Sequence, residues 1–211
     1  MPEWTFARIT DRGVKPALFA LCLVPITLLV WAAVTGRLSA NPLEDIRDTI
    51  GIWTLRFLLI TLSITPLRRI THWHSLTRFR RMLGLFAFFY AVLHLVTYVW
   101  FDQFFDVSEM IDDLSKRRFI MAGYASFVLI VPLAITSTKG WIVRMGGKNW
   151  QLLHRLIYIS AAAGVLHYFW RVKLDISRPA IYAIILGALL IFRVLRKRRY
   201  GANIAALCSL F

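Results

Sequence analysis

The stretch RRMLGLFAFFYAVLHLVTYVWF, residues 80–101, decides the fold of this chain. Two arginines open it, and the 20 residues that follow contain no Asp, Glu, Lys or Arg. A helix of that length rises about 30 Å, which is the thickness of the hydrocarbon layer of a membrane. The apolar residues do not alternate with polar ones, as they would in a strand of a membrane barrel. The stretch therefore predicts a transmembrane helix that carries His94 in its interior.

Five further apolar runs occur along the 211-residue chain, of which 58% is apolar. We expect a single domain over residues 1–211, an all-α integral membrane bundle of six transmembrane helices. These helices are expected near residues 16–35, 52–67, 82–101, 119–136, 151–170 and 179–195. The first run is longer than the apolar core of a signal peptide, which is typically about 7–15 residues, so we expect it to remain as an uncleaved helix.

Basic residues gather in alternate connections between the expected helices. The chain has 26 Lys+Arg against 11 Asp+Glu, a formal net charge of +15. Lys and Arg without any acid occupy connections 68–81 and 137–150 and the tail from Arg196, whereas connections 36–51 and 102–118 hold most of the acids. Connection 171–178 is mildly basic and departs from this alternation. Because cytoplasmic loops are enriched in Lys and Arg, both termini are expected in the cytoplasm, and nucleic-acid binding is not needed to explain the charge.

Three of the five histidines lie inside expected helices: His94 in the third, His154 and His167 in the fifth. An imidazole within hydrocarbon needs a partner, either a bound group or a hydrogen bond to a neighbouring helix. Both helices run outward, so His94, about 18 Å from the inner edge, and His167 can share a level in the outer half of the membrane. Two imidazoles facing each other at one level suit axial ligation of haem iron. His72 and His74 lie in a basic connection and are expected to be solvated.

His154 precedes His167 by 13 residues, about 20 Å along a helix, and is a candidate ligand for a second haem at the inner level. On an ideal helix the two imidazoles would point roughly 140° apart, so either the helix is irregular, for instance near Gly164, or His154 faces a different neighbour. The positions 13 and 14 residues before His94 are Arg81 and Arg80, not histidines. The sequence therefore leaves the haem count at one or two.

A zinc or di-iron centre is the rival interpretation, but such centres recruit Cys, Asp or Glu alongside His. The six apolar runs contain no acid, which favours haem. Arg56, near the outer end of the second helix, is a candidate partner for a haem propionate, with snorkelling to the interface as the alternative. Arg80 and Arg81 are candidates for an inner propionate or an anionic cofactor, although anchoring at the cytoplasmic face also explains them. No nucleotide-binding or hydrolytic motif occurs, so no catalytic residue is assigned.

The segment TSTKGWIVRMGGKNWQLLHRLIYISAAAGVLHYFWRVK, Thr136–Lys173, resembles the fifth helix of the ferric-reductase-like transmembrane family. Three other stretches agree with that family: ITPLRR at Ile64–Arg69, RRMLGLFAFFYAVLHL at Arg80–Leu95, and Asn41-Pro42 before Asp45-Ile46. The resemblance covers nearly the whole chain and is closest to a bacterial branch of haem-binding subunits.

This resemblance implies a haem b subunit of the bacterial inner membrane, with the family's histidines falling on His94, His154 and His167. It implies that electrons from the quinone pool or a reduced flavin pass to a periplasmic molybdopterin methionine sulfoxide reductase, which repairs oxidised periplasmic proteins. FMN is implied as a further cofactor. Eukaryotic relatives add a cytosolic flavin domain, whereas this chain ends soon after its sixth helix, so electrons are expected from elsewhere. The alternatives are a stand-alone ferric or quinone reductase and a non-redox transporter that moves protons through intramembrane histidines.

Overall fold

The structure is a computed structural model that describes residues 13–208, with side chains as far as Leu195. The side chains of the basic tail that begins at Arg196 lie outside this description. The predicted all-α bundle is confirmed: within the described residues there are no strands, and six helical segments are long and apolar enough to cross a membrane. The long helices are α2 (Lys15–Val34), α3 (Pro42–Thr71), α4 (Thr77–Thr97), α6 (Arg118–Ile135), α9 (Leu156–Arg171) and α10 (Ser177–Cys208).

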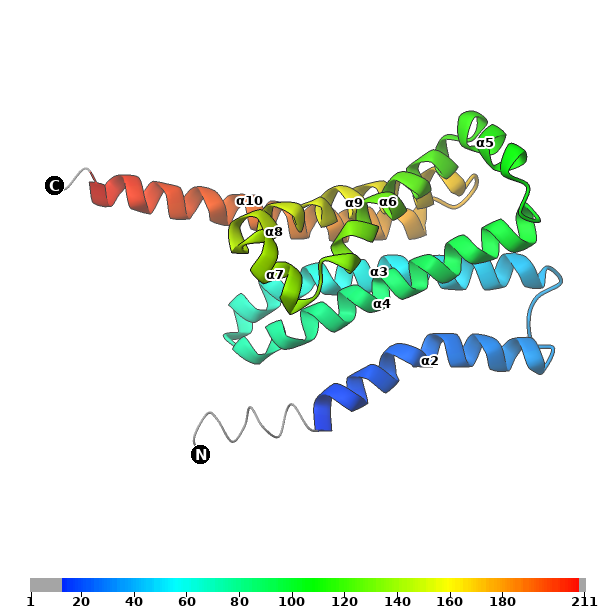
Figure 1. The fold of residues 1–211 in the computed structure, drawn as a ribbon, viewed down its shortest axis with the longest axis horizontal. Coiled ribbons are helices and arrows are strands. Elements are labelled where there is room, and N and C mark those ends of the chain that lie inside the picture. The colour runs from blue at the N-terminus through cyan, green and yellow to red at the C-terminus, as the bar shows by residue number, and fades with distance from the viewer. Residues whose placement is uncertain (1–12, 209–211) are drawn as a thin grey trace.

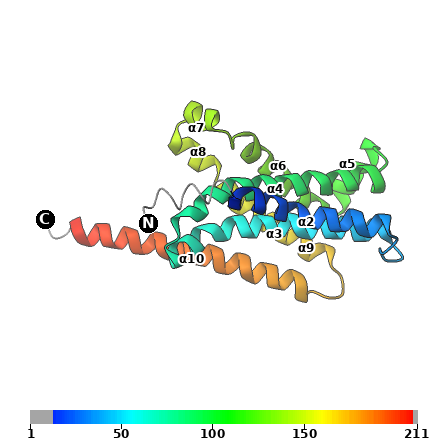
Figure 2. The same ribbon diagram turned by 90° about the horizontal axis from the view of Figure 1, so that it is seen from below.

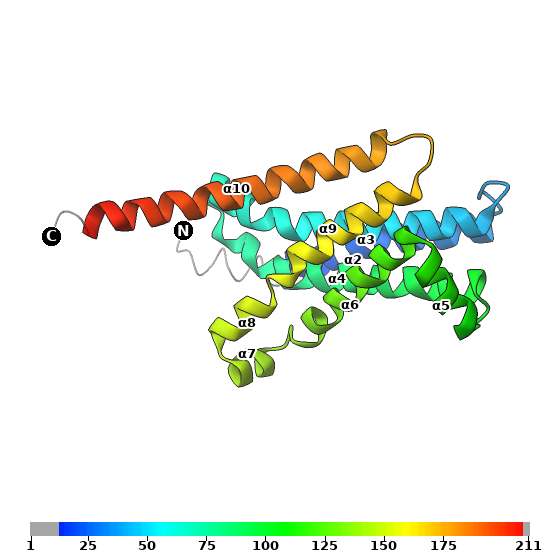
Figure 3. The same ribbon diagram turned by 90° about the horizontal axis from the view of Figure 1, so that it is seen from above.

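Shorter helices connect these spans. A 3-10 turn, His74–Leu76, precedes α4, and a π-helical turn, Tyr98–Asp102, continues it. The amphipathic helix α5 (Val107–Lys116) follows, and α7 (Lys139–Met145) and α8 (Gly147–Leu153) precede α9. Figures 2 and 3 show α7 and α8 standing off one side of the bundle.

The long helices run alternately up and down, so the start of α2 and the end of α10 lie at the same end of the bundle (Figure 1). We call this end, which also holds the connections 72–76 and 136–155, the basic end. The opposite end holds α5 and the connections 35–41 and 172–176, and we call it the acidic end. All the acidic residues in the described part of the chain belong to this acidic end: Glu44, Asp45, Asp48, Asp102, Asp106, Glu109, Asp112, Asp113 and Asp175.

Helix α3 begins at Pro42, ten residues before the start expected from hydropathy at residue 52. Proline is favourable in the first helical turn, and the carboxylates of Glu44 and Asp45 interact favourably with the helix N-terminus. A window that scores only apolar character misses such a polar first turn. The consequence is that Arg47 and Asp48, expected in a loop, occupy fixed positions on a helix.

The fifth membrane segment is irregular, but not at Gly164. Helix α8 ends at Leu153 and α9 begins at Leu156, so His154 and Arg155 form a turn between them. Gly164 instead allows a close approach between α9 and α6, because a Cβ there would lie 3.4 Å from the Ser126 hydroxyl. Beside it, the hydroxyls of Ser126 and Ser160 each donate to the other residue's carbonyl at 2.9 Å. Small residues and reciprocal hydrogen bonds thus join α6 to α9.

Helix α2 joins the bundle through the hydroxyl of Tyr90, which is almost fully buried on α4. This hydroxyl accepts from the Ile26 amide at 3.2 Å and donates to the Cys22 carbonyl at 2.9 Å. In a regular helix those two backbone groups would bond each other. Pro25, which lacks an N–H, lies beside them inside α2. The tyrosine therefore satisfies two backbone groups where the proline disturbs the helix.

Candidate functional site

A cavity of about 670 Å³ lies between α3, α4, α6 and α9 and extends to the acidic end of the bundle. That volume is within the range of pockets for small molecules and cofactors, about 300–1,000 Å³. Its inner walls are mainly apolar and include Leu55 and Leu58 of α3, Ala91 of α4, and Ile130 of α6. Its outer rim is charged, with Arg47, Asp102, Asp113, Arg117 and Arg171 among its members.

His94 of α4 and His167 of α9 both line this cavity, and their ring centres lie 6.1 Å apart with the ring planes at 80°. Each ring is tethered through Nδ1 to a backbone carbonyl: His94 to Arg47 at 3.1 Å, His167 to Phe119 at 2.6 Å. A carbonyl oxygen only accepts, so Nδ1 is the protonated nitrogen in each ring. Each Nε2 therefore keeps its lone pair, which is the state of a histidine that ligates a metal.

Two glycines leave room for these imidazoles. A Cβ at Gly51 of α3 would lie 2.8 Å from Cε1 of His94, and one at Gly123 of α6 would lie 2.8 Å from Nδ1 of His167. Real Cβ contacts are not that short, so any larger residue at either position would displace the ring. The rings are thus held in slots between neighbouring helices, and neither is free to turn away from the cavity.

The arrangement fits a bis-histidine haem. Two imidazole nitrogens bound to one metal ion at about 2 Å each would place the ring centres roughly 6 Å apart. The apolar walls suit a porphyrin face, and the charged rim suits its propionates. Within the described residues, four buried polar atoms on this cavity have no hydrogen-bond partner: Arg47 Nε, Gln103 Oε1, Tyr124 Oη and Asp48 Oδ1, the last of which forms an ion pair with Arg171. Such groups are costly without a partner, which indicates that a bound group with polar substituents belongs here.

Three arginines, Arg47, Arg117 and Arg171, lie on the rim of the cavity, and Arg56 does not. Arg47 pairs with Asp102 at 2.5 Å, and Arg171 contacts Asp48 and lies 3.9 Å from Glu44. Arg56, which the sequence suggests for a propionate, does not line the cavity: its guanidinium lies over Trp53 at 4.7 Å and donates to the Tyr182 hydroxyl at 3.0 Å. One sequence signal could have identified Arg47. Asn41-Pro42 is a pattern typical of a helix start, and a helix that begins there includes Arg47, which hydropathy alone assigns to a loop.

His154 lies apart from this site, in the turn before α9. Its ring stacks on Trp150 with centres 3.9 Å apart, and its Nε2 lies 3.2 Å from the Thr136 hydroxyl. Among the described side chains, no second histidine makes a ring contact with it, and no group of three or more His, Cys, Asp or Glu side chains is placed to hold a metal ion.

The remaining predicted site residues lie at the basic end. Arg80 is half-buried and interacts electrostatically with His154. Arg81 is exposed, as are His72 and His74. None of these four side chains lines the cavity that holds His94 and His167.

Comparison of the sequence with known proteins shows the family of this chain. Residues 50–165 match the family model described as "Ferric reductase like transmembrane component". A "Protein-methionine-sulfoxide reductase heme-binding subunit MsrQ" from Herminiimonas arsenicoxydans is 54% identical over 86% of this chain and 84% of its own length. Proteins of the same name from Polaromonas naphthalenivorans and Azospira oryzae are each 48% identical, over 98% and 89% of this chain and 98% and 81% of their own lengths.

This chain therefore belongs to the ferric-reductase-like transmembrane family and, within it, to the MsrQ subunits. It is a multi-pass protein of the bacterial inner membrane and a membrane subunit of a redox system.

Proposed function

We propose that this chain is the haem b subunit that carries electrons across the inner membrane to a periplasmic molybdopterin methionine sulfoxide reductase (MsrP). The observation that carries the proposal is the pair of imidazoles, His94 and His167, which meet across an apolar cavity with both Nε2 atoms available. Haem bound there would supply one-electron transfer. The name of the relatives, which calls them heme-binding subunits of a methionine sulfoxide reductase, supports the same role.

The residues of the chain have separable tasks in this proposal. The carbonyls of Arg47 and Phe119 fix the tautomer and direction of the two ligand imidazoles, while Gly51 and Gly123 provide the space they need. The apolar wall, including Leu55 and Leu58, keeps water from the centre of the cavity. Arg47 and Arg171 are placed to receive propionates at the rim, where their present carboxylate partners are themselves close to the surface.

The acidic end is proposed to face the periplasm. The basic residues of connections 68–81 and 136–155 would then lie in the cytoplasm, as the distribution of Lys and Arg favours. The cavity between His94 and His167 would open toward a periplasmic acceptor. Electrons would enter from the cytoplasmic side, from quinol or from a reduced flavin, with FMN as a candidate cofactor and His154 as a candidate ligand at that level. The whole chain is proposed to form one domain.

The proposal is tested with the purified full chain in detergent. The reduced protein should show the α-band of a b-type haem, and oxidised MsrP with methionine sulfoxide as substrate should reoxidise that haem. A matched sample without MsrP measures reoxidation by oxygen and buffer and is the control. Prompt reoxidation that requires MsrP is the expected result.

Two results would contradict the proposal. A colourless protein whose reconstituted vesicles move protons would favour the transporter alternative. A haem protein that reduces ferric chelates or quinones at full rate, and that MsrP leaves reduced, would be a stand-alone reductase.

A further inference from the structure

The large cavity has a polar side where α4 and α6 reach the acidic end of the bundle. Four residues of this side line the cavity, and we call them the outer polar cluster: Tyr98, Gln103, Asp113 and Tyr124. The first two belong to the turn that continues α4, whereas Asp113 belongs to α5 and Tyr124 to α6. Arg47 and Arg171, which are placed for propionates, come from α3 and α9 instead. The two sides of the cavity therefore offer different chemistry to a bound group.

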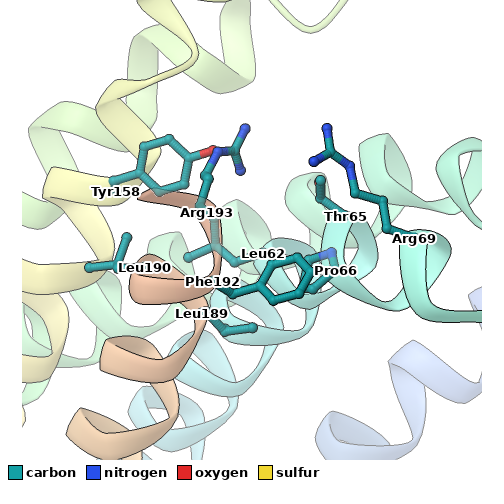
Figure 4. A pocket seen from close by; sticks show the side chains of 9 residues that line it. All are labelled: Leu62, Thr65, Pro66, Arg69, Tyr158, Leu189, Leu190, Phe192 and Arg193. Carbon is teal, nitrogen blue, oxygen red and sulfur yellow. The ribbon is translucent and has the colours of Figure 1, made fainter. Parts of the chain in front are cut away.

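A smaller pocket at the basic end does not compete for the porphyrin. It lies between α3, α9 and α10 and has a volume of about 50 Å³, against about 670 Å³ for the cavity of the two histidines. Figure 4 shows its lining, with Tyr158 and Arg193 on one side and Thr65 and Arg69 on the other. A space of that size admits a group of a few atoms. The carboxyl groups of a haem therefore have to be accommodated in the large cavity.

Asp113 fixes the orientation of the amide in the outer polar cluster. Its carboxylate accepts from Gln103 Nε2 at 2.7 Å and from the Tyr98 hydroxyl at 3.2 Å. Arg117 Nε lies 3.0 Å from its other oxygen. Because a carboxylate only accepts, it is the nitrogen of the Gln103 amide that faces Asp113. The amide oxygen is left on the cavity wall, buried and without a partner among the described residues.

The backbone holds Gln103 in this position. Its amide donates to the Tyr98 carbonyl at 3.2 Å, and its carbonyl accepts from the Asp106 amide at 2.8 Å. Gln103 is only 6% exposed, whereas Phe104 and Phe105, which follow it, are exposed and have φ of 47° and 64°. Two consecutive side chains in the left-handed region are strained, and such strain persists where the surrounding structure needs it. Here the strained turn directs an amide, and not a phenylalanine, into the cavity.

The hydroxyl of Tyr124 is the second polar group of this cluster that lacks a partner in the described part of the chain. The Tyr124 ring meets that of Tyr98 edge-on, with centres 6.3 Å apart, so the hydroxyl belongs to the same side of the cavity as the Gln103 amide. A phenolic hydroxyl can donate a hydrogen bond, whereas an amide oxygen only accepts one. A bound group that satisfies both must accept one hydrogen bond and donate another.

The charges on this side disfavour an anion. Residues 102–118, which include α5, contain five carboxylates and three cations: Asp102, Asp106, Glu109, Asp112, Asp113, Lys116, Arg117 and Arg118. An ionised carboxylate would meet this excess of negative charge and the oxygen of the Gln103 amide, and both interactions disfavour it. On the opposite side, the buried atom without a partner on Arg47 is a donor, Nε, which suits an ionised carboxylate.

We propose that the outer polar cluster binds one of the two haem propionates in its protonated form, as a neutral propionic acid. This inference rests on the haem binding proposed above and deepens it. The O–H of the acid would donate to Gln103 Oε1, and its carbonyl oxygen would accept from the Tyr124 hydroxyl. Arg47 and Arg171 would then hold the other propionate, in its ionised form, and not both. A neutral carboxyl removes one negative charge from the surroundings of the iron, which favours the reduced haem.

The test is infrared spectroscopy of the full chain in detergent, loaded with haem that is isotopically labelled at its propionate carboxyl carbons. Subtracting the spectra of the labelled and unlabelled proteins isolates the propionate bands. At neutral pH the wild type should show the C=O stretch of one protonated carboxylic acid beside the bands of one carboxylate. Tyr124→Phe should shift this C=O stretch to higher wavenumber, because the carbonyl loses a hydrogen bond. Gln103→Met, which removes the acceptor of the acid proton, should shift or abolish it.

Tyr182→Phe and Gln151→Met are the matched controls, since they make the same changes at residues that do not line the cavity. Both should leave the propionate bands unchanged. Tyr124→Phe removes no hydrogen bond that the structure describes, so this variant tests the inference even if Gln103→Met fails to fold. Two ionised propionates in the wild type, or a C=O band that neither cluster variant moves, would overturn the inference and leave the haem assignment intact. A protein without the α-band of haem would overturn both.

Discussion

His94 on α4 and His167 on α9 face each other with ring centres 6.1 Å apart and ring planes at 80°, although 73 residues separate them in the sequence. Each ring donates its Nδ1 proton to a carbonyl of another helix, α3 for His94 and α6 for His167. Four helices therefore determine the relative position of two nitrogen atoms. This dependence makes the site sensitive to substitutions that touch neither histidine directly.

Gly51→Ala and Gly123→Ala should each reduce haem occupancy. The new methyl group would lie 2.8 Å from the imidazole of His94 or His167, so the ring must leave its slot or the helices must separate. Gly187→Ala in α10, where a Cβ meets nothing within 4 Å, is the control and should retain the wild-type haem content. The haem-to-protein ratio of the purified variants measures the effect. Full occupancy with an unshifted Soret band in both cavity variants would show that the slots are not required.

Arg171→Gln should lower the midpoint potential of the haem by about 20–60 mV, on the order of one kcal/mol for one partly screened charge. The reason is that a nearby cation stabilises the reduced iron, and Arg171 lies on the cavity rim. Arg56→Gln removes the same charge from a position outside the cavity lining and should leave the potential nearly unchanged. Potentiometric titration of the α-band measures the midpoint potential of both variants. Equal shifts in the two variants would contradict the assignment of Arg171 to the rim of the haem site.

Tyr90→Phe should destabilise the fold by about 1–3 kcal/mol, because the Cys22 carbonyl and the Ile26 amide lose their shared partner in a segment without water. The haem spectrum should be unaffected, since Tyr90 does not line the cavity. Tyr182→Phe removes a tyrosine hydroxyl that, among the described side chains, accepts a hydrogen bond from Arg56, and it should cost less. Thermal unfolding in detergent compares the two variants. A Tyr90→Phe protein as stable as the wild type would contradict the role given to this hydroxyl.

Ser160→Val should lower both the stability and the haem content. Ser160 is fully buried between α6 and α9, and a larger side chain there would separate the helices that carry Gly123 and His167. Ser126→Ala removes hydroxyl bonds without adding volume and should cost only about 0.6 kcal/mol, the usual contribution of such a bond in membranes. Measuring both the haem content and the thermal unfolding of each variant separates the effect on haem binding from the effect on stability. Loss of stability with full haem occupancy in Ser160→Val would show that the spacing of α6 and α9 does not control the site.

The sequence predicted the fold from uniform apolar runs and the shared level of His94 and His167 from helix direction and rise. It did not predict the long polar start of α3, because Pro42 and Glu44 favour a helix through local geometry and charge, which hydropathy does not measure. The sequence therefore did not single out Arg47, which lines the cavity, whereas Arg56, the candidate propionate partner, lies outside the lining.

Gly51 and Gly123 escaped notice for a different reason. A glycine inside a helix signals a close approach, but the sequence does not say which side chain approaches. An irregular fifth helix, for instance near Gly164, was one of the two expectations for His154, and the break lies instead at His154 and Arg155, where no sequence signal marks a turn. For the two glycines, the approaching side chain comes from a distant segment of the sequence.

The optical spectrum of single histidine variants tests the central claim most directly. His94→Ala and His167→Ala should each lose the outer-site haem and its reduced α-band, whereas His154→Ala should retain that haem, because His154 lies outside the cavity. Circular dichroism of the same samples checks that the helices persist. Retention of the full b-type band in both His94→Ala and His167→Ala would contradict the account.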